Sequence, residues 1–448
     1  MVRSIIITGI LLTLQVSGQH VAKTENHLHK PARIIGDSLW VSKSAYADKL
    51  YGFWLGQCIG NWTGLVTEMD KIGNVGDTKT GAFYTRDEWG QPDEPSIWGE
   101  GVPSELSKNI DFVFKGQGEI WGADDDTDME YMYQHLLLTH KTPYLTPKQI
   151  RQGWLHHIHE KEENYLWVSN QKAFDLMQNG MLPPATSDPE NNPHFDMIDA
   201  QLTTEIFGLF APGHPETALK MAWLPIRVTA RKEAALIAEF YITMHSLAIL
   251  PSNQEPESQI MEIATIARAQ VPDTTYVAKM FDFVASCYIS GIPWEATRDS
   301  VYNRYQVQQM DGYTVTSRNL YCNGCFAGGI NFAASLISLF YGKGNLPETI
   351  KIGTLAGWDS DNPTATWGGL LGFIYGKDGI EKAFGRSFSD KFNIHRTRKN
   401  FEPYAIDNFR HMAINGVKVT EMTILKELNG RVDKGSNSWV IPWNIPKK

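Results

Sequence analysis

The spacing of apolar residues is helical along most of the chain, beginning near Tyr46. The segments 129–137, 234–248 and 332–340 each repeat apolar residues at roughly three to four positions, which places them on one face of a helix. Alternating runs rich in Val and Ile, which a half-buried sheet requires, are nearly missing from the sequence. The pattern therefore predicts an all-α fold.

The same pattern divides the chain into four parts. Residues 1–18 are predicted to be an export signal, and residues 19–44 form a polar lead-in with little periodicity. Helical spacing continues from 45 to 385, interrupted between 63 and 122 by a Gly- and Pro-rich stretch that predicts long loops. The periodicity then weakens, so residues 386–448 are predicted to be a C-terminal extension.

The export signal is predicted from its three expected regions. Arg3 provides a basic start, Ile5 to Val16 is apolar, and Val16-Ser17-Gly18 offers small residues for cleavage before Gln19. The alternative is an amphipathic first helix, which the all-round apolar character of this run disfavours. The run is shorter than the roughly 20 apolar residues of a membrane span, and no Cys follows it to carry a lipid. We expect a periplasmic or secreted protein without a membrane anchor.

The composition limits the partners of the chain. Hydrophobic residues make up 42% and charged residues 20%, as in an ordinary globular protein with ample core. A formal net charge of -9 without a basic run argues against nucleic acid, because phosphate binding needs a basic surface. Trp is abundant, with 14 residues; most should be core, but Trp also stacks on sugars and bases. We expect a monomer that acts on a small molecule or a saccharide.

The four cysteines leave two interpretations open. Cys322 and Cys325 are close enough in sequence to form a disulfide in an exported protein, or they are buried thiols like Cys58 and Cys287. Two cysteines alone do not make a zinc site.

Two short acidic clusters carry the strongest chemical signal. Asp124, Asp125 and Asp126 precede a helix expected from about Thr127, and a second cluster at 359–362 lies more than two hundred residues later. Crowded carboxylates repel one another, and in a partly buried site a cation relieves that repulsion. The alternative to a metal site is an acidic helix cap on a solvated surface. One Asp is enough for a cap, so three consecutive Asp exceed that need. All candidate ligands are oxygens, which favours magnesium, manganese or calcium over zinc.

The second cluster contains Asp359, Asp361 and Asn362, of which Asn362 is predicted to cap the next helix. A calcium loop of the EF-hand type also uses alternating Asp, but it needs Gly at its sixth position and Glu at its twelfth. Counted from Asp359, those positions hold Thr364 and Leu370, so the EF-hand interpretation fails.

A third segment lies near the start of the helical region. Gly recurs at every fourth position from 52 to 64, which leaves one helix face smooth. Because Gly costs helix stability, four in register indicate close helix packing or a functional demand. Glu68 follows directly and is either part of a site or a lone surface carboxylate.

Together these segments resemble the ADP-ribosylglycohydrolase family. That family shows a Gly-Asp-x-x-Gly-x-Pro-x-Glu segment, a Thr-Asp-Asp-Thr cluster and a late Gly-x-Asp-x-Asp-Thr cluster. The matching stretches here are 60–68, 124–127 and 357–362, in the same order, and the resemblance spans roughly residues 46–385. Three departures from the family pattern concern candidate site residues: Asn61 replaces Asp, Asp124 stands where Thr is usual, and Asn362 replaces the final Thr.

The resemblance implies a fold of orthogonal helices around a central cleft with two Mg²⁺ ions, or Mn²⁺ in their place. It also implies the following roles: catalytic Glu68, Asp125 and Asp361; metal ligands Asp124, Asp125, Asp126, Asp359, Asp361 and Asn362; substrate contacts Asn61, Trp121, Gly122 and Trp358.

The implied reaction is hydrolysis of an N- or O-glycosidic bond at C1 of a furanosyl unit. A carboxylate such as Glu68 protonates the leaving group or activates water, and metal ions lower the pKa of bound water. Two alternatives remain open. One is an exported hydrolase of a glycan or nucleoside furanoside on the same fold, since Trp residues at 54, 62, 98, 121, 358 and 367 suit a carbohydrate as well as an adenine ring. The other is a non-catalytic, metal-dependent module that binds sugar or ADP-ribose.

Overall fold

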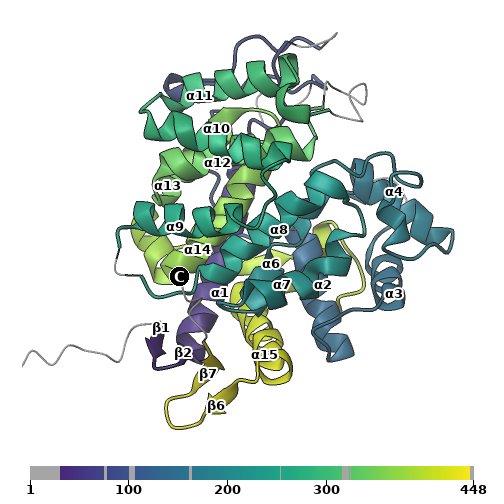
Figure 1. Cartoon of the computed structure of the whole chain (residues 1–448), viewed down its shortest axis with the longest axis vertical. Helices are drawn as coiled ribbons and strands as arrows, with labels where there is room; N and C mark the ends of the chain where they lie inside the picture. Colours follow the sequence, from purple (N-terminus) through teal and green to yellow (C-terminus); the bar gives the residue numbers. More distant parts are fainter. Residues whose placement is uncertain are drawn as a thin grey trace, which may run out of the picture. The chain divides into compact units, whose positions relative to one another are not determined.

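The computed structural model describes residues 31–74, 78–99, 106–160, 164–252, 254–314, 322 and 324–443. The predicted export signal lies outside these residues. Helices dominate the described chain, and the few strands are short (Figure 1). The all-α prediction is confirmed. None of the described helices has both the length and the apolar character needed to cross a membrane.

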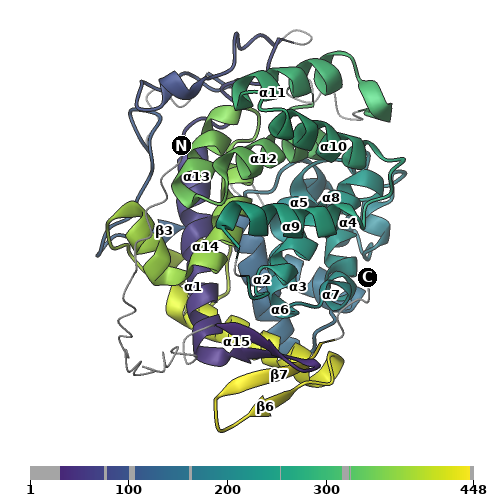
Figure 2. The ribbon, with the colours of Figure 1, turned by 60° about the vertical axis from the view of Figure 1, so that its left-hand side comes forward.

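Two long helices, α1 (Lys43–Gly64) and α14 (Asp361–Phe384), run side by side through the middle of the fold (Figures 1 and 2). Every residue of α1 from 50 to 64 is buried, so other elements surround this helix. The two helices are antiparallel: Gly52 lies against Gly372, whereas Gly64 lies against Asp361. The C-terminal end of α1 therefore meets the N-terminal end of α14.

The regularly spaced glycines form the contact between these two helices. A Cβ atom added to Gly56 would lie 2.1 Å from the carbonyl oxygen of Gly368, and one added to Gly60 would lie 1.9 Å from that of Thr364. Any larger side chain would force the backbones apart. The packing interpretation of the glycine spacing is confirmed, and its consequence is a fixed register between α1 and α14.

The remaining helices cover this central pair. Helix α2 (Asp125–His140) approaches the junction of α1 and α14 with its N-terminus, and α12 (Gly328–Gly342) and α13 (Leu346–Ala356) pack on α14. The other helices are α3 (Pro147–His157), α4 (Val168–Gln178), α5 (Asp199–Thr203), α6 (Ile206–Phe210), α7 (Pro215–Ile226), α8 (Lys232–Leu247), α9 (Pro256–Arg268), α10 (Tyr276–Ile289), α11 (Trp294–Val301) and α15 (Phe409–Glu427).

Two small sheets join the ends of the chain to the helices. An antiparallel sheet has the order β1 (Ala32–Ile35), β2 (Ser38–Ser42), β7 (Ser438–Pro442), β6 (Arg431–Asp433). In the second sheet, β3 (Trp121–Gly122) pairs parallel with β4 (Lys391–Asn393), which pairs antiparallel with β5 (Ile406–Asn408).

These sheets correct the predicted boundaries of the domain. The lead-in (19–44) and the extension (386–448) were expected to lie outside it, but β2 pairs with β7 and α15 packs along α1. From residue 31 onward the chain forms one compact unit. The strands are at most five residues long, so their alternation is too brief to stand out in the sequence.

The two site helices begin earlier than expected. Helix α2 starts at Asp125 with Asp124 as its N-cap, and α14 starts at Asp361 with Ser360 as its N-cap. The helix start predicted near Thr127 and the N-cap predicted at Asn362 were therefore each placed two residues too late. Acidic residues are favourable in the first turn of a helix, where they face unpaired backbone N–H groups. Asp125, Asp126 and Asp361 lie in such first turns, whereas Asp124 and Asp359 precede them.

Candidate metal centre and cavity

The antiparallel packing of α1 and α14 brings the distant acidic residues together. Carboxylate oxygens of Glu68, Asp359 and Asp361 lie within 4.8 Å of one another, and so do those of Asp124, Asp125 and Asp361. Asp361 belongs to both groups. The two clusters and Glu68 therefore form one continuous acidic centre at the meeting point of α1, α2 and α14.

Hydrogen bonds hold the Glu68 loop against the loop before α14. The hydroxyl of Thr67 donates to the carbonyl oxygen of Thr354 over 2.5 Å and lies 3.0 Å from the hydroxyl of Ser360. On the other side of Glu68, the N–H of Met69 donates to the carbonyl oxygen of Trp358 over 2.9 Å. Glu68 is thus held between two anchored residues, beside Asp359 and Asp361.

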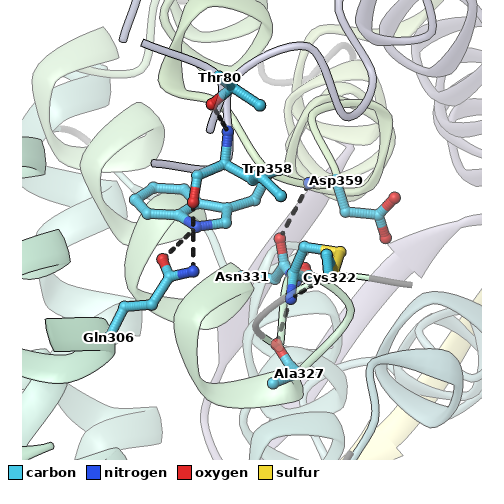
Figure 3. The surroundings of a disulfide bond; sticks show 9 residues. Thr80, Gln306, Cys322, Ala327, Asn331, Trp358 and Asp359 are labelled. Atoms are coloured by element: carbon cyan, nitrogen blue, oxygen red, sulfur yellow. Dashed lines mark hydrogen bonds between the residues drawn. A yellow bond between two sulfur atoms is a disulfide. The ribbon is translucent and has the colours of Figure 1, made fainter. Parts of the chain in front are cut away.

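Asn331 of α12 fixes the backbone of Asp359 (Figure 3). Its amide oxygen accepts the N–H of Asp359 over 3.2 Å, while its amide nitrogen donates to the carbonyl oxygens of Cys325 and Ala327 at 2.7 and 3.0 Å. Cys325 forms a disulfide with Cys322, the first of the two interpretations that the sequence left open. The disulfide turn therefore supports the residue that positions Asp359.

Two buried asparagines orient the remaining carboxylates. Asn61 donates to Asp126 over 3.1 Å and to Asp361 over 3.4 Å. Asn362 donates to Asp126 over 3.3 Å, and its amide oxygen accepts a hydrogen bond from Gln201 over 3.2 Å. Asn61 was expected to contact substrate and Asn362 to bind metal. Both side chains are buried and donate hydrogen bonds to the carboxylates of the centre.

Two further predicted substrate contacts are buried and are not part of the cavity wall described below. Trp121 and Trp358 are 0% exposed, and their indole N–H groups donate to the carbonyl oxygen of Ser389 over 3.0 Å and to Gln306 over 2.8 Å. Gly122 is buried as well, and its carbonyl oxygen accepts the indole N–H of Trp62 over 3.0 Å. Closeness in sequence to the acidic clusters does not set the direction of a side chain.

A cavity of about 350 Å³ opens above the acidic centre. Glu68 and Asp125 are its most exposed carboxylates, whereas Asp124, Asp126, Asp359 and Asp361 are buried in its floor. Its wall also contains large aromatic side chains and one arginine, namely Trp62, Trp98, Tyr165, Trp167, Phe326 and Arg396. Among the predicted site residues, the carboxylates line the cavity, and Asn61, Asn362, Trp121, Gly122 and Trp358 do not.

Burial and mutual repulsion raise the pKa values of these carboxyl groups. For Glu68, burial is the largest cause and the charges of Asp361 and Asp359 add to it. Burial likewise raises the pKa of Asp125, Asp126 and Asp359, and it raises that of Asp361 to about 7. Several ionised carboxylates are thus unfavourable here without a counter-charge.

The acidic centre fits divalent cations. Its donors are all carboxylate oxygens, which hard cations prefer. Asp361 Oδ1 is buried and has no hydrogen-bond partner among the described residues, although a buried polar atom normally has one. Asp361 lies in the first turn of α14, and Asp124 caps α2. A cation between the two carboxylate groups would use the free oxygen and offset the repulsion.

Comparison with known proteins identifies the family. The family model described as ADP-ribosylglycohydrolase matches residues 42–407, more than half of the chain. The chain belongs to the ADP-ribosylglycohydrolase family. Among solved structures, a chain titled "ADP-ribosylglycohydrolase-related protein complex" aligns with 13% identity and a TM-score of 0.46, over 85% of this chain and 99% of that chain. No curated protein sequence matches.

Arg396 accounts for the departure from the family pattern at Asp124. Its guanidinium donates to the carbonyl oxygen of Ala123 over 2.6 Å and to Asp124 over 3.3 Å. It also lies over the rings of Trp62 and Tyr165, with centroid distances of 5.3 and 4.9 Å. Where the ADP-ribosylglycohydrolase pattern has Thr, this chain thus has an Asp whose added charge is paired with a cation.

Sequence reasoning missed Arg396 because it lies in the segment taken for an extension. The family match reaches residue 407 and so includes it. Tyr165, Trp167 and Phe326 were missed for another reason: each comes from a loop beside a helix end, where no periodicity marks it. Three consecutive Asp suggest that a positive residue lies near them, and this was the one signal that pointed to Arg396. The sequence has many Lys and Arg residues, so this signal does not single out Arg396.

Proposed function

We propose that this chain is a metal-dependent glycoside hydrolase that cleaves an N- or O-glycosidic bond at C1 of a furanosyl unit. Membership of the ADP-ribosylglycohydrolase family supports a hydrolase of glycosidic bonds. The observation that carries the proposal is the pair of carboxylate groups that share Asp361 beneath a cavity. Such a pair matches the demands of two neighbouring oxygen-ligated ions.

The carboxylates divide between two proposed ions, Mg²⁺ or Mn²⁺. Asp124, Asp125 and Asp361 would hold one, and Glu68, Asp359 and Asp361 surround the place of the other. Bound there, the ions would supply fixed positive charge for sugar hydroxyls and a water of lowered pKa. Asp126 would complete the set, oriented by the two asparagines that donate to it.

Glu68 is the proposed proton-transfer group. It follows α1, its carboxyl group lies on the cavity wall, and it is more exposed than Asp359 or Asp361. Burial favours the protonated form that a general acid needs. The charges of Asp361 and Asp359 also raise the pKa of Glu68, and the proposed ions would offset that part of the effect. A protonated Glu68 would donate its proton to the atom leaving C1, and its carboxylate form would accept a proton from the incoming water.

Asp125 and Asp361 act on the same reaction from the floor of the cavity. Asp125 is half-buried and open to the cavity, and Asp361 connects both carboxylate groups. Their proposed role is to orient the furanosyl unit and stabilise the positive charge that develops on it as the C1 bond breaks.

The proposal is tested by assaying the purified chain on a panel of C1-linked furanosides. The panel contains methyl and p-nitrophenyl furanosides, nucleosides and ADP-ribosylated peptide, each with Mg²⁺ and with excess EDTA. We expect release of at least one aglycone that stops in EDTA and returns with Mg²⁺ or Mn²⁺. Hydrolysis at the same rate in EDTA would contradict metal dependence. Ligand binding without any turnover would show that the chain is a binding module and not an enzyme.

A further inference from the structure

Three aromatic side chains form one group on the cavity wall. The rings of Trp98 and Trp167 are 21° from parallel with centroids 5.9 Å apart. Phe326 lies 26° and 17° from these two rings, at 6.2 and 6.1 Å. We call Trp98, Trp167 and Phe326 the aromatic platform. They come from three separate segments of the chain, and all three line the cavity above the carboxylates.

The exposure of the platform sets it apart from core packing. Trp98 is 40% exposed and Trp167 is 42% exposed, whereas Phe326, which stacks on both, is 5% exposed. Large aromatic side chains that serve only the core are buried, as Trp54, Trp154 and Trp367 are in this fold. Exposed aromatic surface inside a cavity is the usual mark of a ligand-binding wall.

The ring geometry determines how a ligand can use this surface. A flat ring held between two parallel rings needs about 7 Å between them, which is two van der Waals separations of roughly 3.5 Å. Trp98 and Trp167 lie closer than that, at 5.9 Å between centroids. The platform therefore offers one broad face on which a ring can lie, rather than a slot between two rings.

The charges around the cavity favour an uncharged ligand. Within the described ranges, Arg396 is the only basic residue of the cavity wall, and Asp124, Ala123 and two aromatic rings already engage it. The other charged groups of the wall are carboxylates. A sugar ring matches this combination, because it has an apolar C–H face for the rings and hydroxyl groups for the carboxylates and the proposed ions.

We propose that the aromatic platform binds a second, uncharged sugar ring of the substrate, next to the furanosyl unit held at the carboxylates. This inference rests on the proposed function and narrows it: the substrate is a neutral furanosyl oligosaccharide or glycoside. A cavity of about 350 Å³ lies at the lower end of the range of small-ligand pockets, as a short saccharide requires.

The test measures binding by calorimetry in the presence of Mg²⁺, with Glu68→Gln as background so that ligand is not consumed. The probes are trisaccharides with arabinofuranosyl, fructofuranosyl or galactofuranosyl ends, the matching methyl furanosides, adenosine and ADP-ribose. We expect a trisaccharide to bind more tightly than its methyl furanoside. Trp98→Ala and Trp167→Ala should each weaken trisaccharide binding about tenfold, because each removes one stacked ring. The affinity of the trisaccharide should thereby approach that of its methyl furanoside.

Trp223→Ala is the matched control. Trp223 is 46% exposed on α7 and is not part of the cavity wall, so its loss should leave both affinities unchanged. Trisaccharide affinity unaffected by Trp98→Ala and Trp167→Ala in folded protein would overturn the inference. Tighter binding of adenosine or ADP-ribose than of every trisaccharide, or no binding of any trisaccharide, would also overturn it.

The inference and the proposed function fail in different ways. Metal-dependent hydrolysis of a methyl furanoside, with no effect of the Trp variants on trisaccharide binding, would refute the platform alone. Trisaccharide binding that depends on both Trp residues, without hydrolysis of any furanoside by the unmodified chain, would refute the hydrolase and leave the platform in place.

Discussion

Glu68 shows how much depends on one side chain in this site. It stands one residue beyond Thr67, which is tied to the loop before α14, and its carboxyl group lies within 4.8 Å of Asp359 and Asp361. Its place is compatible with two roles, proton transfer to the leaving group or direct ligation of an ion. The two roles respond differently to the same substitution.

Replacing Glu68 by Gln should separate these roles. Gln keeps the size and an oxygen ligand but cannot transfer a proton, and such transfer typically contributes about 10²- to 10⁴-fold in rate. We expect kcat to fall by that factor while Mg²⁺ affinity, measured by calorimetry, changes little. A folded variant with unchanged kcat would remove Glu68 from the mechanism, and a parallel loss of Mg²⁺ affinity would assign it to ligation.

The individual site residues were predictable only where chemistry marks them. Consecutive carboxylates signal a cation because their mutual repulsion is costly in a buried site without one, and Asp124, Asp125, Asp359 and Asp361 do meet. Trp121 and Trp358 carry no such signal. Trp121 belongs to β3, which pairs with β4, and its side chain is held in the core by a hydrogen bond to Ser389. Trp358 is held in the core by a hydrogen bond to Gln306. Neither contact can be predicted from the sequence.

At the scale of elements, the α1–α14 pair sets the geometry of the site. Its glycines allow backbone contact, and its register places the end of α1 beside Asp361. Four glycines at helical spacing could be read from the sequence as a packing surface. The partner helix could not be identified in the same way, because small residues on α14 also fit a close approach to a ligand.

Gly60→Ala should destabilise the fold despite the better helix propensity of Ala. The new Cβ would lie 1.9 Å from the carbonyl oxygen of Thr364, so the helices must separate, and overpacking typically costs about 1–3 kcal/mol. Gly435→Ala, in the exposed turn between β6 and β7, is the control, since its Cβ would meet only Asp433 Oδ2 at an ordinary contact distance of 3.6 Å. We expect a lower Tm for the first variant and an unchanged or higher Tm for the second. Equal Tm values would contradict the packing account.

Helix α2 buries a second carboxyl group behind the site. Glu130 accepts hydrogen bonds from Gln57 over 2.7 Å and from the N–H of Ile206 over 2.6 Å, and burial raises its pKa to about 8. In the unfolded chain the same group titrates near 4.5. The folded state therefore holds a proton that the unfolded state loses between these pH values, so the contribution of Glu130 to stability falls as pH rises through that window.

Glu130→Gln should remove this part of the pH dependence. Gln stays neutral, and rotation of the Gln57 amide would offer its unpartnered oxygen to the new N–H group. We expect the Tm of the parent protein to fall more steeply between pH 5 and about 8 than that of the variant, measured in EDTA. Glu205, the neighbouring buried carboxyl, is present in both proteins, and loss of the Glu130 charge removes one of the causes that raise its pKa. Identical slopes would show that Glu130 does not hold its proton.

At the scale of the whole molecule, the two ends of the described chain complete the domain. Strand β2 pairs with β7, α15 lies against α1, and Arg398 is fully buried with its guanidinium 2.9 Å from Asp128. The all-α class and the central helices followed from periodicity. The closing strands did not, because their pairings join residues about four hundred positions apart and each strand is at most five residues long.

Deletion of residues 386–448 should therefore unfold the domain rather than trim it. It removes a strand partner from β2 and from β3, uncovers α1 and leaves the buried Asp128 without Arg398. Loss of one partner of a buried ion pair alone costs about 3–5 kcal/mol. We expect no soluble, cooperatively melting product, checked by circular dichroism and gel filtration. A folded fragment that retains metal-dependent activity would show that residues 386–448 are an extension separable from the domain.

The central claim is that two distant acidic segments and Glu68 form one divalent metal centre. A crystal of the protein grown with Mn²⁺ tests it directly through anomalous scattering. We predict two peaks that share Asp361, one beside Asp124 and Asp125 and one beside Glu68 and Asp359, with oxygen ligands at about 2.0–2.6 Å. Asp361→Asn should abolish or greatly weaken both. Saturating Mn²⁺ that leaves these carboxylates without a peak would contradict the account.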